Sequence, residues 1–319
     1  MLRDRIDPEL QAFNDAVSAD WRKHPPLETL TPPEARAVAE QVRARWTKGG
    51  PGMASTHEHL VQTEKGQIRV RIYVPRERNT PAPALIYSHG GGFTLFSIDT
   101  HDRLMREYAA AGGFTVVGVD YPLAPEAKFP IALDLVTERV RTLHRDGARF
   151  GIDGERLALG GDSAGGNFAV SACLRLRDRG ELPIVKALLS NYGGFAVGCS
   201  DEAEAEFGGP NAVLARDESY YFFGNYLNHP DEARDPYACP INADLRGLPP
   251  IFLAIAECDI VAEHNVAMAQ RFRDAGVDAA SKIYRGATHS FLEAMSVSAL
   301  AREAIGDGAR FIAHRLNVA

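Results

Sequence analysis

One short stretch constrains the fold of this chain more than any other: LALGGDSAGGN, residues 157–167. An apolar run ends at two glycines, and a helical pattern begins after a single serine, which predicts a strand, a tight turn and a helix. Gly161, Ser163 and Gly165 form a Gly-x-Ser-x-Gly spacing, typical of a turn that lifts a nucleophilic hydroxyl above the edge of a sheet. Small residues are needed on both sides because the two backbones come close together there.

The other apolar runs predict a parallel sheet that helices cover on both faces. Continuous apolar runs separated by helical patterns recur at residues 84–87, 114–119, 157–159, 185–189 and 251–255. Such runs are typical of strands buried on both faces. Residues 68–74 instead alternate apolar with polar side chains, which favours an antiparallel pair at the start of the sheet. We therefore expect an α/β fold with a mostly parallel central sheet.

Two segments fall outside this rhythm and are expected to form a cap over the sheet. The first 50 residues carry two amphipathic helical patterns, each opened by a capping residue and a proline. Between residues 191 and 248 the alternation breaks, and one helix is expected over about 217–227. A segment this long without regular structure is usually functional. The expected division is therefore 1–50 as the N-terminal helical part of a cap, 51–319 as the main α/β domain, and about 192–245 as the second part of the cap.

The composition argues against several classes of function. A formal net charge of -7 disfavours a nucleic-acid surface, and no stretch approaches the roughly 20 apolar residues of a membrane span. The first residues are charged where a secretory leader needs an apolar run. The cysteines are too widely spaced for a disulfide framework or a zinc site: Cys173, Cys199, Cys239 and Cys258. We expect a cytoplasmic protein with no nucleic-acid or membrane partner, no metal and no cofactor.

A serine nucleophile needs a base, an acid that orients the base, and donors for an oxyanion. The sequence HGGGF, residues 89–93, follows a buried run and fits a loop whose backbone N–H groups face a substrate oxygen. Asp259 and His289 each follow an expected strand, and α/β sheets place their sites just beyond strand ends. The order Ser163, Asp259, His289 is that of α/β-hydrolases.

Taken together, these motifs resemble the bacterial hormone-sensitive-lipase-like family of serine esterases, within the α/β-hydrolase superfamily. The resemblance covers about residues 50–319. It rests on HGGGF (89–93), DYPLAPE (120–126) with Phe129-Pro130, GDSAGGN (161–167), LRGLPP (245–250) and the neighbourhoods of Asp259 and His289.

The resemblance implies an α/β-hydrolase fold with Ser163 as nucleophile, His289 as base and Asp259 as orienting acid. It also implies an oxyanion hole formed by the backbone N–H groups of Gly91, Gly92 and Ala164. The substrate would be a small-molecule ester, and a homodimer is one assembly that such relatives adopt.

The chain departs from the family pattern at three positions. Pro122 stands where the family usually has Arg, Ile260 where a Pro follows the acid, and Ser290 where a Gly follows the base. None of them is a member of the triad. Ile260 follows Asp259 and Ser290 follows His289, so these two differences could change the conformation of the loops that carry the acid and the base.

Other residues compete for roles at the site. Glu257 is the alternative acid, and His57-Glu58-His59 resembles a metal pair, although we interpret it as a solvated turn because no third ligand is near. Glu126 and Asp162 are interpreted as structural anchors. The aromatic run 220–223 could line an acyl pocket, but packing of the cap is favoured. The histidines without a motif are expected to be surface or packing residues: His101, His144, His229, His264 and His314.

Three functions remain open. The leading hypothesis is a carboxylesterase that hydrolyses small to medium acyl esters through an acyl-enzyme on Ser163. An amidase acting on aryl amides could use the same triad, with the sequence around residues 193–195 selecting its substrates. A non-catalytic small-molecule receptor is the third hypothesis, and the presence of His289 argues against it.

Overall fold

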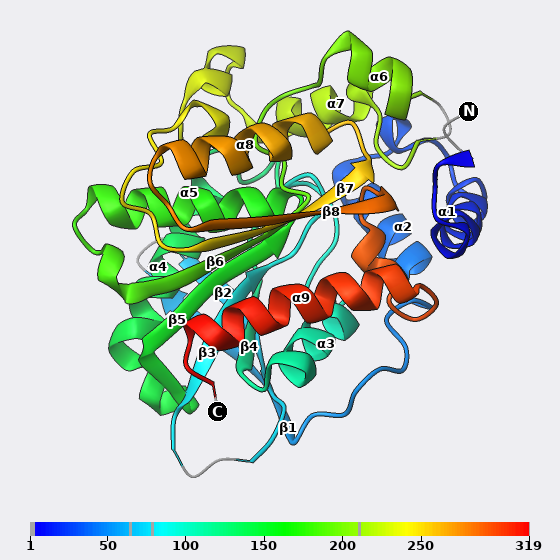
Figure 1. Ribbon diagram of the computed structural model, residues 1–319. Coiled ribbons are helices and arrows are strands. Elements are labelled where there is room, and N and C mark those ends of the chain that lie inside the picture. Colours follow the sequence, from blue (N-terminus) through cyan, green and yellow to red (C-terminus); the bar gives the residue numbers. More distant parts are fainter. Residues whose placement is uncertain (1–3, 64–65, 78–79, 210–211, 319) are drawn as a thin grey trace.

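The computed structural model describes residues 4–63, 66–77, 80–209 and 212–318. The first expected cap segment is therefore described from residue 4 onward, and the second except at residues 210 and 211. Within these ranges the central sheet has eight strands in the order β1-β2-β4-β3-β5-β6-β7-β8 (Figure 1). Strand β2 is antiparallel to β1 and β4, and all other neighbours are parallel. Both the mostly parallel sheet and its antiparallel start are therefore confirmed. The strands are β1 (Ser55–Thr63), β2 (Gly66–Val74), β3 (Ala82–Ser88), β4 (Thr115–Asp120), β5 (Ile152–Asp162), β6 (Val185–Asn191), β7 (Ile251–Cys258) and β8 (Ala279–Thr288).

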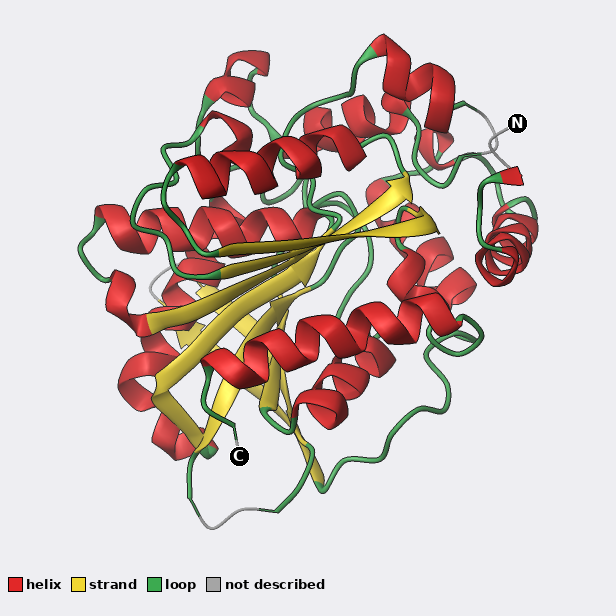
Figure 2. Cartoon of the chain, viewed as in Figure 1, coloured by secondary structure: helices red, strands yellow, loops and turns green. Residues whose placement is uncertain are grey.

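Helices cover both faces of the sheet (Figure 2). Side chains alternate across it: in β3, Ala84 and Ile86 join the core on one face, whereas Leu85 and Tyr87 join the core on the other. A strand with two buried faces carries apolar residues at every position, which explains the continuous runs. One face packs against α3 (Asp102–Gly112) and α9 (Ala299–Arg315), and the other against α4 (Ile131–Asp146), α5 (Ala164–Asp178) and α8 (Ala262–Asp274).

Further helices lie near the carboxyl ends of the parallel strands (Figure 1): α1 (Pro8–Trp21), α2 (Pro32–Arg43), α6 (Asp201–Phe207) and α7 (Arg216–Tyr226). The side chain of Asp7 caps α1 by accepting from the backbone N–H of Glu9 at 2.9 Å. The backbone N–H of Thr31 donates to Glu34 at 2.9 Å at the start of α2, as the capping-box pattern predicts. The helix expected over about 217–227 is α7.

Short 3₁₀ turns complete the described elements: η2 (Leu27–Thr29), η3 (Gly147–Phe150), η4 (Leu182–Ile184), η5 (Pro230–Arg234), η6 (Pro240–Asn242) and η7 (Phe291–Ala294). Among the helices that the structure describes, none combines the length and apolar character needed to cross a bilayer.

The turn expected at His57-Glu58-His59 is wrong, because these residues belong to β1. His57 pairs with Ile72 of β2, and Glu58 pairs with Arg71. The prediction of solvent exposure holds for His57 and Glu58. Because β1 is an edge strand, its side chains need no apolar alternation, and the sequence carries no strand pattern there.

Candidate active site

Ser163 occupies the tight turn between β5 and α5, with φ 51° and ψ -115°. This backbone conformation is strained for a residue with a side chain, and the chain around it maintains the strain. A Cβ at Gly165 would overlap the carbonyl oxygen of Ser88, and a Cβ at Gly161 would overlap the backbone of Gly165. The small residues predicted on both sides are therefore required by close packing. The backbone N–H of Ser163 donates to the carbonyl of Asn191 at 2.9 Å, which fixes the turn to β6.

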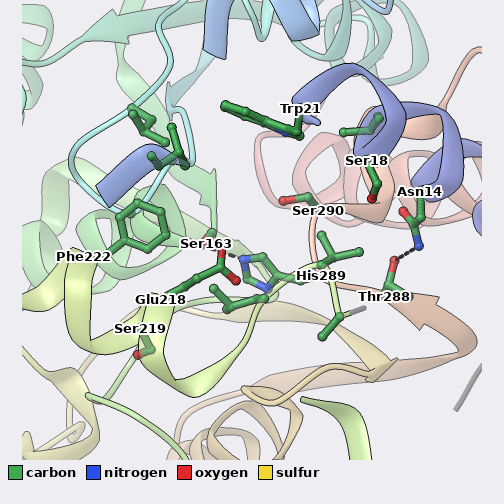
Figure 3. Close-up of a pocket in the computed structure, with 18 of the residues that line it drawn as sticks. Asn14, Ser18, Trp21, Ser163, Glu218, Ser219, Phe222, Thr288, His289 and Ser290 are labelled. Atoms are coloured by element: carbon green, nitrogen blue, oxygen red, sulfur yellow. Dashed lines mark hydrogen bonds between the residues drawn. The ribbon is translucent and has the colours of Figure 1, made fainter. Parts of the chain in front are cut away.

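Three side chains from distant parts of the sequence meet above this turn, and Figure 3 shows two of them, Ser163 and His289. The hydroxyl of Ser163 lies 2.9 Å from Nε2 of His289, and Nδ1 of the same ring lies 2.7 Å from Oδ2 of Asp259. In the arrangement that uses both contacts, the serine O–H donates to Nε2 and Nδ1–H donates to the carboxylate. Asp259 follows β7 and His289 follows β8, so adjacent parallel strands deliver the acid and the base to one edge of the sheet.

The surroundings of His289 set its proton affinity. Burial by itself lowers the pKa of the imidazole, but the negative charge of Asp259 and the hydrogen bond to it outweigh burial, so the pKa of His289 lies above 6.5. Asp259 is 3% exposed, and its second oxygen accepts from the backbone N–H of Val261 at 3.1 Å. The edge of the Tyr192 ring lies against the imidazole, with centroids 5.1 Å apart. The imidazole of His289 is thus fixed in orientation and readily protonated.

Glu257, the alternative acid, is engaged elsewhere. Its carboxylate accepts from the backbone N–H of Gly286 at 2.8 Å and lies 3.7 Å from the guanidinium of Arg5. The structure therefore places Asp259, and not Glu257, at the imidazole.

The glycine loop after β3 faces the same point. Gly91 and Gly92 have φ values of 114° and 58°, which a residue with a side chain rarely adopts. A Cβ at Gly92 would overlap the ring of Phe222. Ala164, the first residue of α5, carries the N–H at the positive end of that helix. Within the described chain, these three amides have no protein acceptor, and all three residues line one cavity together with Ser163.

Two carboxylates hold this loop, as predicted for structural anchors. Buried Asp162 accepts from the hydroxyl of Tyr87 at 2.9 Å and from the backbone N–H of Gly90 at 3.2 Å. Glu126 pairs with Arg36 of α2, and Nε of that arginine also donates to the carbonyl of Thr94. The acidic residue beside the nucleophile is therefore directed toward the glycine loop.

A buried charged cluster that the sequence did not reveal surrounds Asp162, the residue before Ser163. His101 is 1% exposed, with Nε2 lying 3.4 Å from Oδ2 of Asp162 and 4.0 Å from Oε1 of Glu293. Glu293, in η7, forms an ion pair with Arg43 at the end of α2. The expectation of a surface or packing residue is thus incomplete for His101, which is buried with polar partners.

The pKa values of the two carboxyl groups in this cluster shift in opposite directions. Burial raises the pKa of Asp162, but the charge of His101 outweighs it, so the pKa lies below 3.8. Burial raises the pKa of Glu293 above 4.5, and the charges of Arg43 and His101 offset only part of that increase. Ligand atoms of His101, Asp162 and Glu293 lie within 4.8 Å of one another. The guanidinium of Arg43 supplies the positive charge that this group of acids needs.

A cavity of about 1280 Å³ opens over Ser163. Figure 3 shows its walls: Asn14, Ser18 and Trp21 of α1 on one side and Phe222 of α7 on the other. The aromatic run 220–223 divides between the two roles considered for it. Tyr221, Phe222 and Phe223 line the cavity, Phe223 also packs in the core at 5% exposure, and Tyr220 is exposed.

Comparison with known proteins identifies the class. Residues 85–293, more than half of the chain, match the family model described as alpha/beta hydrolase fold. A hyperthermophilic esterase from the archaeon Pyrobaculum calidifontis is similar, with 30% identity, a TM-score of 0.90, and coverage of 97% of this chain and 98% of that one. A thermophilic and thermostable carboxylesterase cloned from a metagenomic library has 32% identity and a TM-score of 0.86, covering 90% and 98%. A thermostable esterase from Pseudomonas putida has 27% identity and a TM-score of 0.91, covering 99% of each chain.

The sheet order, the serine turn and these similarities define a hydrolase of the α/β class. The chain belongs to the alpha/beta hydrolase fold family, and within it to the hormone-sensitive-lipase-like esterases, as its motifs indicated. It is a carboxylic ester hydrolase.

Proposed function

We propose that this enzyme hydrolyses small to medium acyl esters through a covalent acyl-enzyme on Ser163. His289 serves as general base and then general acid, and Asp259 orients it. The backbone N–H groups of Gly91, Gly92 and Ala164 form the oxyanion hole. The observation that carries the proposal is the continuous chain of contacts from serine hydroxyl to imidazole to carboxylate at 2.9 and 2.7 Å.

Each step follows from these positions. Nε2 of His289 takes the serine proton as Oγ bonds to the ester carbon, and negative charge develops on the carbonyl oxygen facing the unpaired amides. The bond from carbon to the alcohol oxygen then breaks, and the imidazolium gives its proton to that oxygen. Water repeats the sequence on the acyl-enzyme and releases the carboxylic acid.

An ester should be strongly preferred over the corresponding amide. We expect kcat/KM for phenyl butanoate to exceed that for butananilide by at least about 10³-fold, because phenoxide leaves the tetrahedral intermediate readily, whereas the aniline nitrogen must be protonated before it can leave. The measurement is initial rates on matched pairs, with 4-nitrophenyl acetate through octanoate to define acyl length. Comparable rates on ester and anilide would favour the amidase.

The pH dependence should reflect the raised pKa of His289. The imidazole acts as base only when neutral, so kcat/KM for an uncharged ester should fall about tenfold per pH unit on the acid side. Because the pKa is raised, the bend should lie above pH 6.5. In Asp259→Asn, residual activity should bend at lower pH, since burial then acts without the opposing carboxylate. A bend below 6.5 in the unaltered enzyme would contradict the assignment.

We also propose that the N-terminal helices and the 192–245 segment act together as a two-part cap over residues 51–319. Both parts line the cavity, and Arg5 joins them by an ion pair with Glu206 and by lying 5.0 Å from the centroid of the Phe207 ring.

A reducing, cytoplasmic location is also proposed, on the basis of the cysteines. All four thiols are free, and Cys173, Cys239 and Cys258 are buried, which fits a compartment where thiols stay reduced.

A further inference from the structure

The direction in which the alcohol portion of the ester leaves is set by the catalytic geometry. The leaving oxygen must receive its proton from Nε2 of His289, so it lies within hydrogen-bond reach of that atom. The carbonyl oxygen points instead toward the glycine loop. The alcohol portion therefore begins beside the imidazole and extends along the residues around it, which include Thr288 and Ser290 on the same loop and the facing side of α1.

This side of the cavity carries a group of polar side chains beside apolar ones such as Val17 and Trp21. Figure 3 shows Asn14, Ser18, Thr288 and Ser290 beyond His289 and Phe222 on the opposite side of Ser163. Asn14 donates from its side-chain amide to the hydroxyl of Thr288 at 3.1 Å, which joins α1 to the end of β8. That contact leaves the amide oxygen of Asn14 and the hydroxyl proton of Thr288 available for other partners.

Further polar groups on this wall are unpaired. Gln11, Asn14 and Ser18 lie on one face of α1, and Oε1 of Gln11 is buried without a hydrogen-bond partner. In the part of the chain that the structure describes, the hydroxyls of Ser18 and Ser290 also have no protein partner. A buried acceptor left unpaired is costly, so a wall of this kind favours a ligand that supplies hydrogen bonds.

Ser290 is held in an unfavourable backbone conformation. Its φ of 58° and ψ of 18° lie in the left-handed region, where a residue with a Cβ is disfavoured relative to glycine. The adjacent position is the base itself, and the Ser290 side chain projects into the cavity between Trp21 and His289 (Figure 3). Strained residues of this kind cluster at functional sites. Here the strained residue carries a hydroxyl group and adjoins His289, beside which the leaving oxygen is expected.

We propose that the physiological ester carries a polyhydroxylated alcohol, which the wall formed by Asn14, Ser18, Thr288 and Ser290 recognises through hydrogen bonds. This inference rests on the proposed function, because it takes the leaving direction from His289. It assigns substrate selection on the alcohol side to α1 and to the residues flanking the base. The acyl portion, in contrast, extends toward the side of Phe222.

Three butanoate esters test the proposal: 2,3-dihydroxypropyl, 2,3-dimethoxypropyl and propyl. The dimethoxy ester shares the electron-withdrawing effect of the diol without its donors, and the propyl ester lacks both. We expect kcat/KM for the dihydroxypropyl ester to exceed each of the others by about tenfold or more, corresponding to one or two neutral hydrogen bonds. Acid release in a pH-stat measures all three. Equal rates for the dihydroxypropyl and propyl esters would overturn the proposal.

Variants locate the effect. Asn14→Ala, Ser290→Ala and Ser290→Gly should each reduce the ratio of dihydroxypropyl to propyl ester kcat/KM about threefold to tenfold, chiefly through KM. Ser290→Ala keeps the strain and Ser290→Gly relieves it, so equal reductions identify the hydroxyl as the cause. Asn317→Ala and Asn317→Gly are matched controls, because Asn317 is exposed, lies outside the cavity and has φ 50°. They should leave the ratio unchanged.

Two results would distinguish failure of this inference from failure of the proposed function. A ratio that survives in all three site variants would refute recognition by this wall while leaving esterase activity intact. Failure of the unaltered enzyme to hydrolyse any of these esters or 4-nitrophenyl butanoate would instead refute the proposed function, and the inference with it.

Discussion

Ser163→Ala is expected to reduce kcat for 4-nitrophenyl butanoate between about 10⁴- and 10⁶-fold, because the variant lacks the hydroxyl on which the proposed acyl-enzyme forms. The variant loses the hydroxyl that lies 2.9 Å from Nε2 of His289 and retains the backbone amides of Gly91, Gly92 and Ala164 and the binding cavity. Residual catalysis should therefore persist above the uncatalysed rate. A fluorophosphonate should label the unaltered enzyme with one equivalent and leave the variant unlabelled.

Ser281→Ala is the matched control, because Ser281 is exposed on β8 and should be replaceable without loss of rate. Unchanged thermal unfolding of both variants would show that the lost activity is chemical. A Ser163→Ala protein that keeps a tenth of its turnover would refute the acyl-enzyme. An unaltered enzyme that binds small esters but resists labelling would revive the receptor hypothesis.

Arg43→Met is expected to cost about 3–5 kcal/mol of unfolding free energy, the usual penalty for leaving one member of a buried ion pair without its partner. Arg43 and Glu293 are both almost completely buried, and the guanidinium also lies 4.9 Å from the centroid of the Phe96 ring. Without it, Glu293 shares its surroundings with the carboxylate of Asp162. Urea unfolding followed by circular dichroism measures the loss.

The same variant should be less impaired in acid. Burial raises the pKa of Glu293 and the charge of Arg43 opposes that increase, so removal of Arg43 raises the pKa further and lets the carboxyl group become neutral in the folded variant at a higher pH. The difference from the unaltered enzyme should therefore be smaller at pH 5.5 than at pH 8. Adding Glu293→Gln to Arg43→Met should restore about half of the lost free energy, because the unpaired charge is gone. A loss below about 1 kcal/mol, equal at both pH values, would show that the pair contributes little.

The sequence predicted most of the fold because the central strands of the sheet are buried on both faces. In β3, β4 and β7, burial forces an apolar residue at nearly every position, and this is visible without knowledge of any neighbour. Strand β1 differs, because it lies at the solvent-exposed edge of the sheet, where histidine and glutamate are tolerated as well as valine. The sequence at residues 57–59 therefore shows no strand pattern and suggests a turn instead.

The site divides in the same way. Ser163, Asp259 and His289 can be singled out in the sequence because each follows a strand and lies in a recognisable motif, and the structure brings the three side chains into contact. His101 and Arg43 carry no such local signal. Each is polar, and only its distant partners, Asp162 and Glu293, show that it is buried. Long-range pairing of charges leaves no periodicity in a sequence, so this cluster became visible only in three dimensions.

The attachment of α1 to the end of β8, through Asn14 and Thr288 and through the backbone N–H of Asp7 to the carbonyl of Gly286, has an evolutionary consequence. The proposed triad and much of the cavity wall lie on separate stretches of the chain, the triad after residue 160 and the wall of α1 before residue 25. Recombination near codon 50 can therefore give an old reaction centre a new entrance wall, and laboratory shuffling at that point offers a direct route to altered selectivity.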